Sequence, residues 1–83
     1  MNLFKNTKEP HHWVDMDSLR PEVIYDPEYC VVKALKTDIL KNGMLEPLQV
    51  NRENMLIGLG NQRYCILQSL GIKRVPIRYK DEY

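Results

Sequence analysis

The stretch from Met55 to Leu67 constrains the fold of this chain more than any other part of the sequence. It reads Met55-Leu56-Ile57-Gly58-Leu59-Gly60-Asn61-Gln62-Arg63-Tyr64-Cys65-Ile66-Leu67. The pattern is typical of a short buried strand, a glycine turn and a helix that begins at once. Backbone N–H groups and a fixed positive charge meet at the turn. Because the N-terminus of a helix attracts negative charge, this junction predicts an anion site.

The residue types at the junction support that prediction. Gly60 allows the backbone to approach a ligand closely, Asn61 can cap the helix, and Arg63 offers a forked donor to a phosphate. Two interpretations of Arg63 stay open. It binds a phosphate or carboxylate group, or it forms a salt bridge that holds a loop to the sheet. The candidate partners for that bridge are Glu46, Asp15 and Asp17.

The strongest helix signals in the chain predict a first helix that starts at Asp26. Asp26 can accept hydrogen bonds from the free N–H groups at the helix start, and Pro27 fits the first helical position. Gly43 suits the left-handed position after the last turn, so the helix is expected to end at Asn42. Its apolar stripe comprises Val31, Leu35 and Ile39, widened by Val32 and Leu40.

Alternating apolar residues predict short strands before and after this helix. They are expected over 13–16, 48–52, 55–59 and 75–79, with a tight turn that makes the middle two a hairpin. A second helix is expected from about 61 to 70, closed by Gly71. Pro76 removes a backbone donor and predicts that the last strand has a free side at this residue. The fold class is therefore α+β, a small mixed β-sheet with two packed helices.

The bulk properties limit the classes of function. Eighty-three residues make one small domain; residues 1–12 are expected to be a flexible or loosely docked arm, and residues 13–80 the domain. A net charge of +1 gives no general attraction to nucleic acid or to an anionic membrane. No apolar run reaches membrane-spanning length. Cys30 and Cys65 lie in apolar helical patterns, which predicts reduced, buried thiols in a cytoplasmic protein.

Three segments in this order resemble the ParB/sulfiredoxin superfamily, in particular the N-terminal nucleotide-binding domain of ParB. They are Asn42–Val50, Ile57–Tyr64 and Leu70–Ile77, and the resemblance covers roughly residues 13–80. It implies a ParB/sulfiredoxin-like fold in a stand-alone domain. It also implies a phosphate-binding box, which in ParB contacts CTP, at Gly60, Asn61, Gln62 and Arg63. The loop Gly43–Pro47, which contains Glu46, corresponds to the loop that meets the nucleotide from the other side.

Two departures from the family pattern bear on chemistry. Asn61 stands where ParB has an acidic residue implicated in metal-assisted CTP turnover and where sulfiredoxin has a nucleophilic cysteine. An asparagine cannot act as a carboxylate ligand or base, so neither a catalytic residue nor a metal ligand is predicted. Glu46 replaces the usual glutamine and would repel a phosphate unless a cation lies between them.

These observations lead to two main hypotheses. The first is a domain that binds a nucleotide, such as CTP or ATP with magnesium, or another phosphate-bearing ligand, without catalysis. The second is an interaction module for a protein or DNA with a vestigial pocket, as in a phage or mobile-element accessory protein. A CTPase or nuclease ranks third because of Asn61. The candidates for nucleic-acid contact, which otherwise form a solvated edge, are Lys73, Arg74, Arg78 and Lys80.

Overall fold

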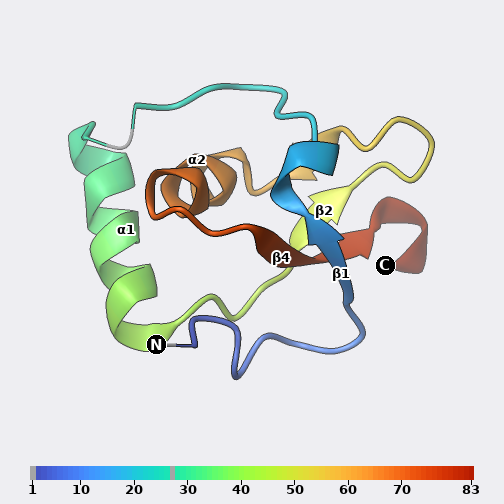
Figure 1. The fold of residues 1–83 in the computed structure, drawn as a ribbon, viewed down its shortest axis with the longest axis horizontal. Coiled ribbons are helices and arrows are strands. Elements are labelled where there is room, and N and C mark those ends of the chain that lie inside the picture. Colours follow the sequence, from blue (N-terminus) through green and yellow to red (C-terminus); the bar gives the residue numbers. More distant parts are fainter. Residues whose placement is uncertain (1, 27) are drawn as a thin grey trace.

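A computed structural model describes residues 2–26 and 28–83, which form a mixed four-stranded sheet and two α-helices (Figure 1). The strands are β1 (His12–Asp15), β2 (Leu48–Val50), β3 (Ile57–Leu59) and β4 (Arg74–Tyr79). The helices are α1 (Cys30–Asn42) and α2 (Asn61–Ser69), and short 3-10 helices, η1 (Met16–Ser18) and η2 (Lys80–Glu82), follow β1 and β4. The predicted α+β class, with a small mixed sheet and two helices, is confirmed.

The strand order is β1-β4-β2-β3, so the last strand in sequence lies inside the sheet. β4 runs antiparallel to β1 and parallel to β2, and β2 and β3 form the predicted antiparallel hairpin. β4 has a neighbour on each side, but its ladder with β2 does not include Pro76, which agrees with the free side expected at that residue. The ladder between β2 and β4 starts where Leu48 pairs with Ile77, one residue beyond Pro76. The N–H that proline lacks is therefore not needed for that ladder.

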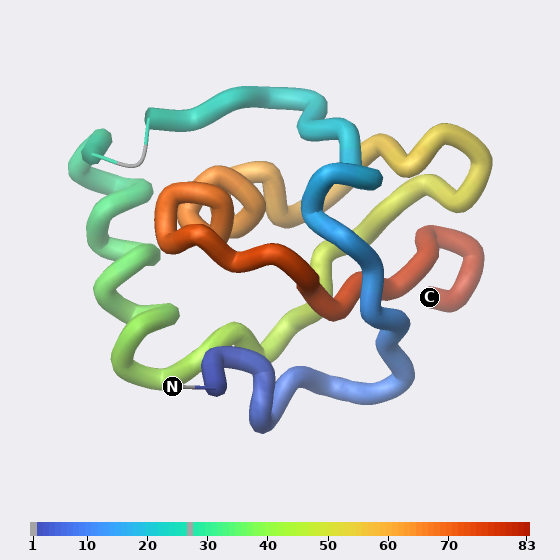
Figure 2. Tube along the Cα trace, in the orientation of Figure 1, coloured from blue at the N-terminus to red at the C-terminus, as the bar shows by residue number. Residues whose placement is uncertain are grey.

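α2 lies between α1 and the sheet, as Figure 1 shows, and both of its sides are covered. Its buried residues are Tyr64, Cys65, Ile66 and Leu67. The sheet side of the core is made by Leu48, Val50, Ile57, Val75 and Ile77, none of which has exposed surface. Figure 2 shows that residues 2–11 and 19–26 run along opposite sides of these layers. Residues 2–11 lie between the C-terminal end of α1 and β1, and residues 19–26 lead from η1 toward the start of α1. No helix in the described part of the chain is long and apolar enough to cross a membrane.

The start of α1 differs from the prediction. The helix begins at Cys30, and the carboxylate of Asp26 accepts a hydrogen bond from the backbone N–H of Glu28 at 2.9 Å, in a turn that precedes the helix. The predicted role of Pro27 lies outside the described residues. Of the predicted stripe, Val32 and Ile39 are buried and Leu35 packs against the core, whereas Val31 and Leu40 are exposed. Cys30 is also exposed, contrary to expectation, because it belongs to the first turn of the helix.

Residues 2–11, the predicted arm, contact the loop that follows α1. The side chains of Leu3 and Thr7 are buried. The backbone N–H of Met44 donates to the Leu3 carbonyl at 2.8 Å, and the Thr7 hydroxyl donates to the Met44 carbonyl at 2.5 Å. The segment therefore packs against that loop, and β1 begins directly after the segment, at His12.

Candidate ligand-binding site at the start of α2

Two adjoining hollows lie where α2 begins, and the side chains of Leu35 and Arg63 line both of them. The first has a volume of about 290 Å³ and is lined by Tyr25, Leu35 and residues 58–63. The second, of about 480 Å³, lies between the C-terminal half of α1, residues 43–46 and Arg63. The hollows bring together all of the predicted ligand-binding residues, which are Gly43, Glu46, Gly60, Asn61, Gln62 and Arg63.

Arg63 is the half-buried cation between the two hollows. Its Nη1 donates to the backbone carbonyl of Glu46 at 2.9 Å. Burial lowers the pKa of the guanidinium, and the charge of Glu46 acts in the opposite direction. The group still stays charged at neutral pH, because the ordinary pKa of arginine lies far above 7.

The structure does not support the interpretation that Arg63 forms a salt bridge to Glu46, Asp15 or Asp17. Within residues 2–26 and 28–83, no carboxylate lies at ion-pair distance from the guanidinium. The carboxylate of Glu46 pairs with Lys8, and that of Asp15 pairs with Arg74. A half-buried guanidinium without a carboxylate partner is suited to an anionic ligand, because its forked donors match phosphate geometry.

Gly60 is required at the start of α2 by both its backbone angle and its surroundings. Its φ is 103°, in the left-handed region that favours glycine. A Cβ added there would lie 2.6 Å from Cδ2 of Leu48 and 3.4 Å from Nη2 of Arg63. The Gly60 carbonyl accepts the first helical hydrogen bond, from the N–H of Tyr64 at 2.8 Å. The backbone N–H groups of residues 61–63 come before that bond, so they have no partner within the helix and point out of its N-terminal end.

The sequence predicts that Asn61 caps α2, but this prediction is wrong. Gly60 is the N-cap residue, and Asn61 is the first residue of the helix. Its Oδ1 accepts hydrogen bonds from the backbone N–H groups of Glu22, at 2.8 Å, and Val23, at 3.3 Å. Its Nδ2 donates to the Ile57 carbonyl at 3.2 Å. The amide therefore joins the start of β3 to the segment that carries Tyr25 to the first hollow.

The sequence indicates that a phosphate could approach Glu46 only with a cation nearby. The structure supplies Lys8 as that cation, a partner that the sequence did not indicate. The Lys8 ammonium bonds to the exposed carboxylate. This bond holds the pKa of Glu46 below its ordinary value, and the charges of Arg63 and Arg78 act in the same direction. Lys8 and Glu46 are 38 residues apart in sequence, and no local pattern joins them.

Gly43 has a φ of 80° directly after α1, as its predicted position requires. A Cβ there would lie 2.9 Å from the carbonyl oxygen of Leu3. Gly43 therefore permits the close approach of the N-terminal segment as well as lining the second hollow. In the described ranges, no group of three or more His, Cys, Asp or Glu side chains is placed to hold a metal ion.

The basic residues suggested for nucleic-acid contact lie on β4 and directly beyond its two ends. Lys73 precedes β4 and Lys80 follows it, so they lie at opposite ends of the strand. Arg74 is bound to β1, since its Nε lies 3.3 Å from the carboxylate of Asp15 and its Nη2 donates to the Trp13 carbonyl at 3.1 Å.

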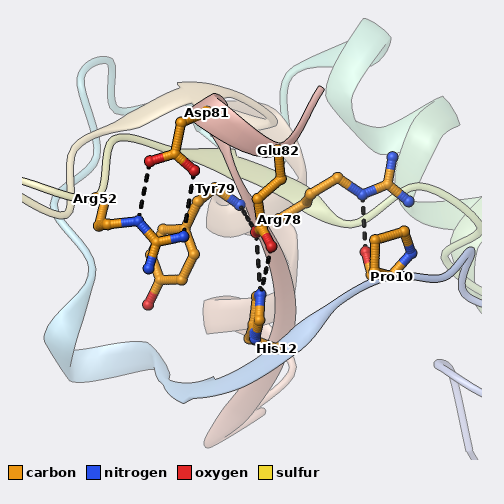
Figure 3. A network of polar contacts seen from close by, with 7 residues as sticks. All are labelled: Pro10, His12, Arg52, Arg78, Tyr79, Asp81 and Glu82. Carbon is orange, nitrogen blue, oxygen red and sulfur yellow. Dashed lines mark hydrogen bonds and ion pairs between the residues drawn. The ribbon is translucent and has the colours of Figure 1, made fainter.

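Arg78 belongs to a network that joins the C-terminal residues to the rest of the domain (Figure 3). Its Nε donates to the Pro10 carbonyl at 2.7 Å, and its guanidinium lies 4.9 Å from the centre of the Tyr83 ring. The other interactions are an ion pair of His12 with Glu82 at 2.9 Å and a forked pair of Arg52 with Asp81 at 2.9 and 3.2 Å. The donors of Arg78 and Arg74 are thus partly used inside the fold.

Several solved structures resemble this chain, whereas family models and curated sequences do not. No protein-family model and no curated protein sequence matches the chain. A mutant free serine kinase in complex with ADP matches with a TM-score of 0.69 and 26% identity, over 93% of this chain and 34% of the kinase chain. A free serine kinase in complex with AMP matches with a TM-score of 0.67 and the same identity and coverage. The chain thus spans about a third of the length of these kinases.

A Pnob8-like ParB-N domain also matches, with a TM-score of 0.63 and 22% identity. The match covers 84% of this chain and 29% of that one. At this level of identity the likeness concerns the fold alone.

Proposed function

Because this chain has the fold of the ParB/sulfiredoxin superfamily, we propose that it binds a nucleotide or another phosphate-bearing ligand where α2 begins. The observation that carries the proposal is the half-buried guanidinium of Arg63, which lines both hollows without a carboxylate partner in the described ranges. The kinase neighbours in complex with ADP and AMP support a nucleotide as the ligand. CTP, ATP and a magnesium requirement stay predictions, as does a cytoplasmic location.

The proposal covers binding and not turnover. The position where ParB resemblance implies an acid is Asn61, whose amide is engaged on both sides with backbone groups. An amide in that role supplies neither a general base nor a carboxylate ligand. The kinase chains are about three times longer than this one, so their activity is not carried over.

A titration followed by NMR tests the proposal. AMP, ADP, ATP and CTP are added in turn to the protein, with and without magnesium, while the backbone amide signals are recorded. We expect the signals of residues 60–63 to move with at least one of these ligands. Signals that stay in place with every ligand would overturn the proposal.

The variant Arg63→Ala separates ligand binding from a structural role. A charge-assisted hydrogen bond to phosphate contributes about 1.5–3 kcal/mol, so affinity should fall roughly tenfold to a hundredfold. The free energy of unfolding should fall by only about 1 kcal/mol, because one hydrogen bond to Glu46 is lost. Arg74→Ala is the matched control, since it removes an arginine that pairs with Asp15 and lines neither hollow, and it should leave affinity unchanged. A loss of stability without a loss of affinity would assign Arg63 to the fold alone.

The second candidate function is a protein-interaction module, and exposed apolar side chains beside the first hollow favour it. Leu59 is 61% exposed and lines that hollow, and Ile24, next to Tyr25, is 72% exposed. Capture of a specific protein that is lost in Ile24→Asp would support this candidate, and capture unaffected by the variant would count against it. A DNA gel shift at low and moderate salt tests the basic residues in the same way, because phosphate contacts weaken with salt.

A further inference from the structure

The loop between α1 and β2 is held in place by the N-terminal segment. Three hydrogen bonds join the two: Met44 N–H to the Leu3 carbonyl at 2.8 Å, the Thr7 hydroxyl to the Met44 carbonyl at 2.5 Å, and Lys8 N–H to the Leu45 carbonyl at 2.8 Å. The same loop lines the second hollow and supplies the carbonyl of Glu46 to Arg63. The segment is therefore in direct contact with the ligand-facing loop.

Glu46 is the one acidic residue of this loop, and its charge works against an anionic ligand. Its backbone carbonyl accepts from Arg63, so the two residues are in contact, and their charges influence each other. If its carboxylate turned toward the guanidinium, it would occupy the donors that a phosphate needs. In the structure the carboxylate pairs with the ammonium of Lys8 and not with the guanidinium.

We infer that Lys8 is a positioning residue of the ligand site, because it pairs with Glu46 and thereby keeps the guanidinium of Arg63 available to an anion. The inference rests on the proposed function and deepens it. It assigns to the N-terminal segment a part in anion binding, through a pair formed across 38 residues of sequence. Lys8 acts through Glu46 and need not touch the ligand.

The affinity for ADP, measured by calorimetry at low ionic strength, tests the inference in a set of variants. Lys8→Ala should weaken ADP binding about threefold to fivefold, in the range expected when an exposed ion pair is lost. Lys8→Arg should retain the wild-type affinity, and Lys8→Ala combined with Glu46→Gln should restore it, because the unpaired carboxylate is gone. Lys5→Ala is the matched control, since Lys5 is exposed in the same segment but lines a separate hollow beside Leu40. An unchanged affinity in Lys8→Ala, or no rescue by Glu46→Gln, would overturn the inference.

A second measurement decides the same question without a ligand. The carboxyl carbon of Glu46 is followed by NMR through a pH titration in the wild-type protein and in Lys8→Ala. The pKa of Glu46 should rise in the variant, because Lys8 is the largest cause of its lowered value. An unchanged titration would overturn the inference even if ADP binds. If the pKa rises while no nucleotide binds to the wild-type protein, the proposed ligand is wrong but the control of Glu46 by Lys8 is upheld.

Discussion

Among single residues, Gly60 determines most directly whether α2 can start where it does. Gly60→Ala would place a Cβ 2.6 Å from Leu48 at a φ of 103°. Left-handed strain and overpacking in the core together should lower the free energy of unfolding by about 2–4 kcal/mol. Gly71→Ala is the control, because Gly71 also has a positive φ, 76°, but no atom lies within 4 Å of its added Cβ. Urea unfolding should show a loss of only about 1 kcal/mol for that variant, and equal losses for the two would contradict the packing argument.

The sequence identifies the residues of the candidate site better than it identifies their partners. The types and spacing of Gly60 and Arg63 are local signals, and the structure brings both to the start of α2. The partner of Glu46 could not be predicted, because Lys8 reaches it only after the chain has folded. Asn61 was assigned a local role as a cap, but its amide is used for contacts with a segment 39 residues earlier. Local rules describe a helix end in isolation, whereas tertiary contacts decide which side chain uses it.

At the scale of elements, η2 is attached to the hairpin between β2 and β3 by the pair of Arg52 with Asp81 (Figure 3). The Arg52 guanidinium holds the pKa of Asp81 below its ordinary value of 3.8. A lowered pKa in the folded state stabilises the fold above the ordinary value, and this contribution is lost as the pH falls through the lowered one. Asp81→Asn should therefore reduce Tm at pH 7, and the difference from the wild type should begin to shrink near pH 3.8 and vanish only when the pH has fallen below the lowered pKa.

Melting curves between pH 7 and pH 2 check this expectation. Glu53→Gln is a suitable control, because it removes an exposed carboxylate from the same hairpin turn. A Tm difference for Asp81→Asn that stays constant down to pH 2 would show that the ion pair does not stabilise η2.

The order of the elements could be predicted from periodicity, whereas the central position of β4 and the first residue of α1 could not. Strand, helix, hairpin, helix and strand follow one another as expected, because each has an apolar face of the right period. Pro76 favours an edge strand, yet β4 is central, since the stagger of β2 places the proline before the shared ladder. The start of α1 depends on tertiary packing, and Asp26, a good cap by composition, caps a preceding turn instead.

For the whole molecule, a small core implies that each buried side chain contributes a large share of stability. A domain of 83 residues is expected to have a free energy of unfolding of roughly 4–12 kcal/mol. Ile66 on α2 is fully buried, so Ile66→Ala should cost about 2–5 kcal/mol by leaving a cavity. Ile24→Ala makes the same chemical change at a side chain that is 72% exposed, and should cost less than about 0.5 kcal/mol. Similar urea midpoints for both variants would contradict the assignment of Ile66 to the core.

The central position of β4 has a consequence for synthesis on the ribosome. In the part of the chain that the structure describes, β1 and the β2–β3 hairpin share no ladder, and β4 joins them. A nascent chain arrested before Arg74 therefore contains both helices and the hairpin but lacks the strand that joins them to β1. Its apolar faces have no complete sheet to cover, and such intermediates are the ones that aggregate or engage chaperones. The domain is thus expected to acquire its fold in one late step, after β4 has left the exit tunnel, and not progressively from its N-terminus.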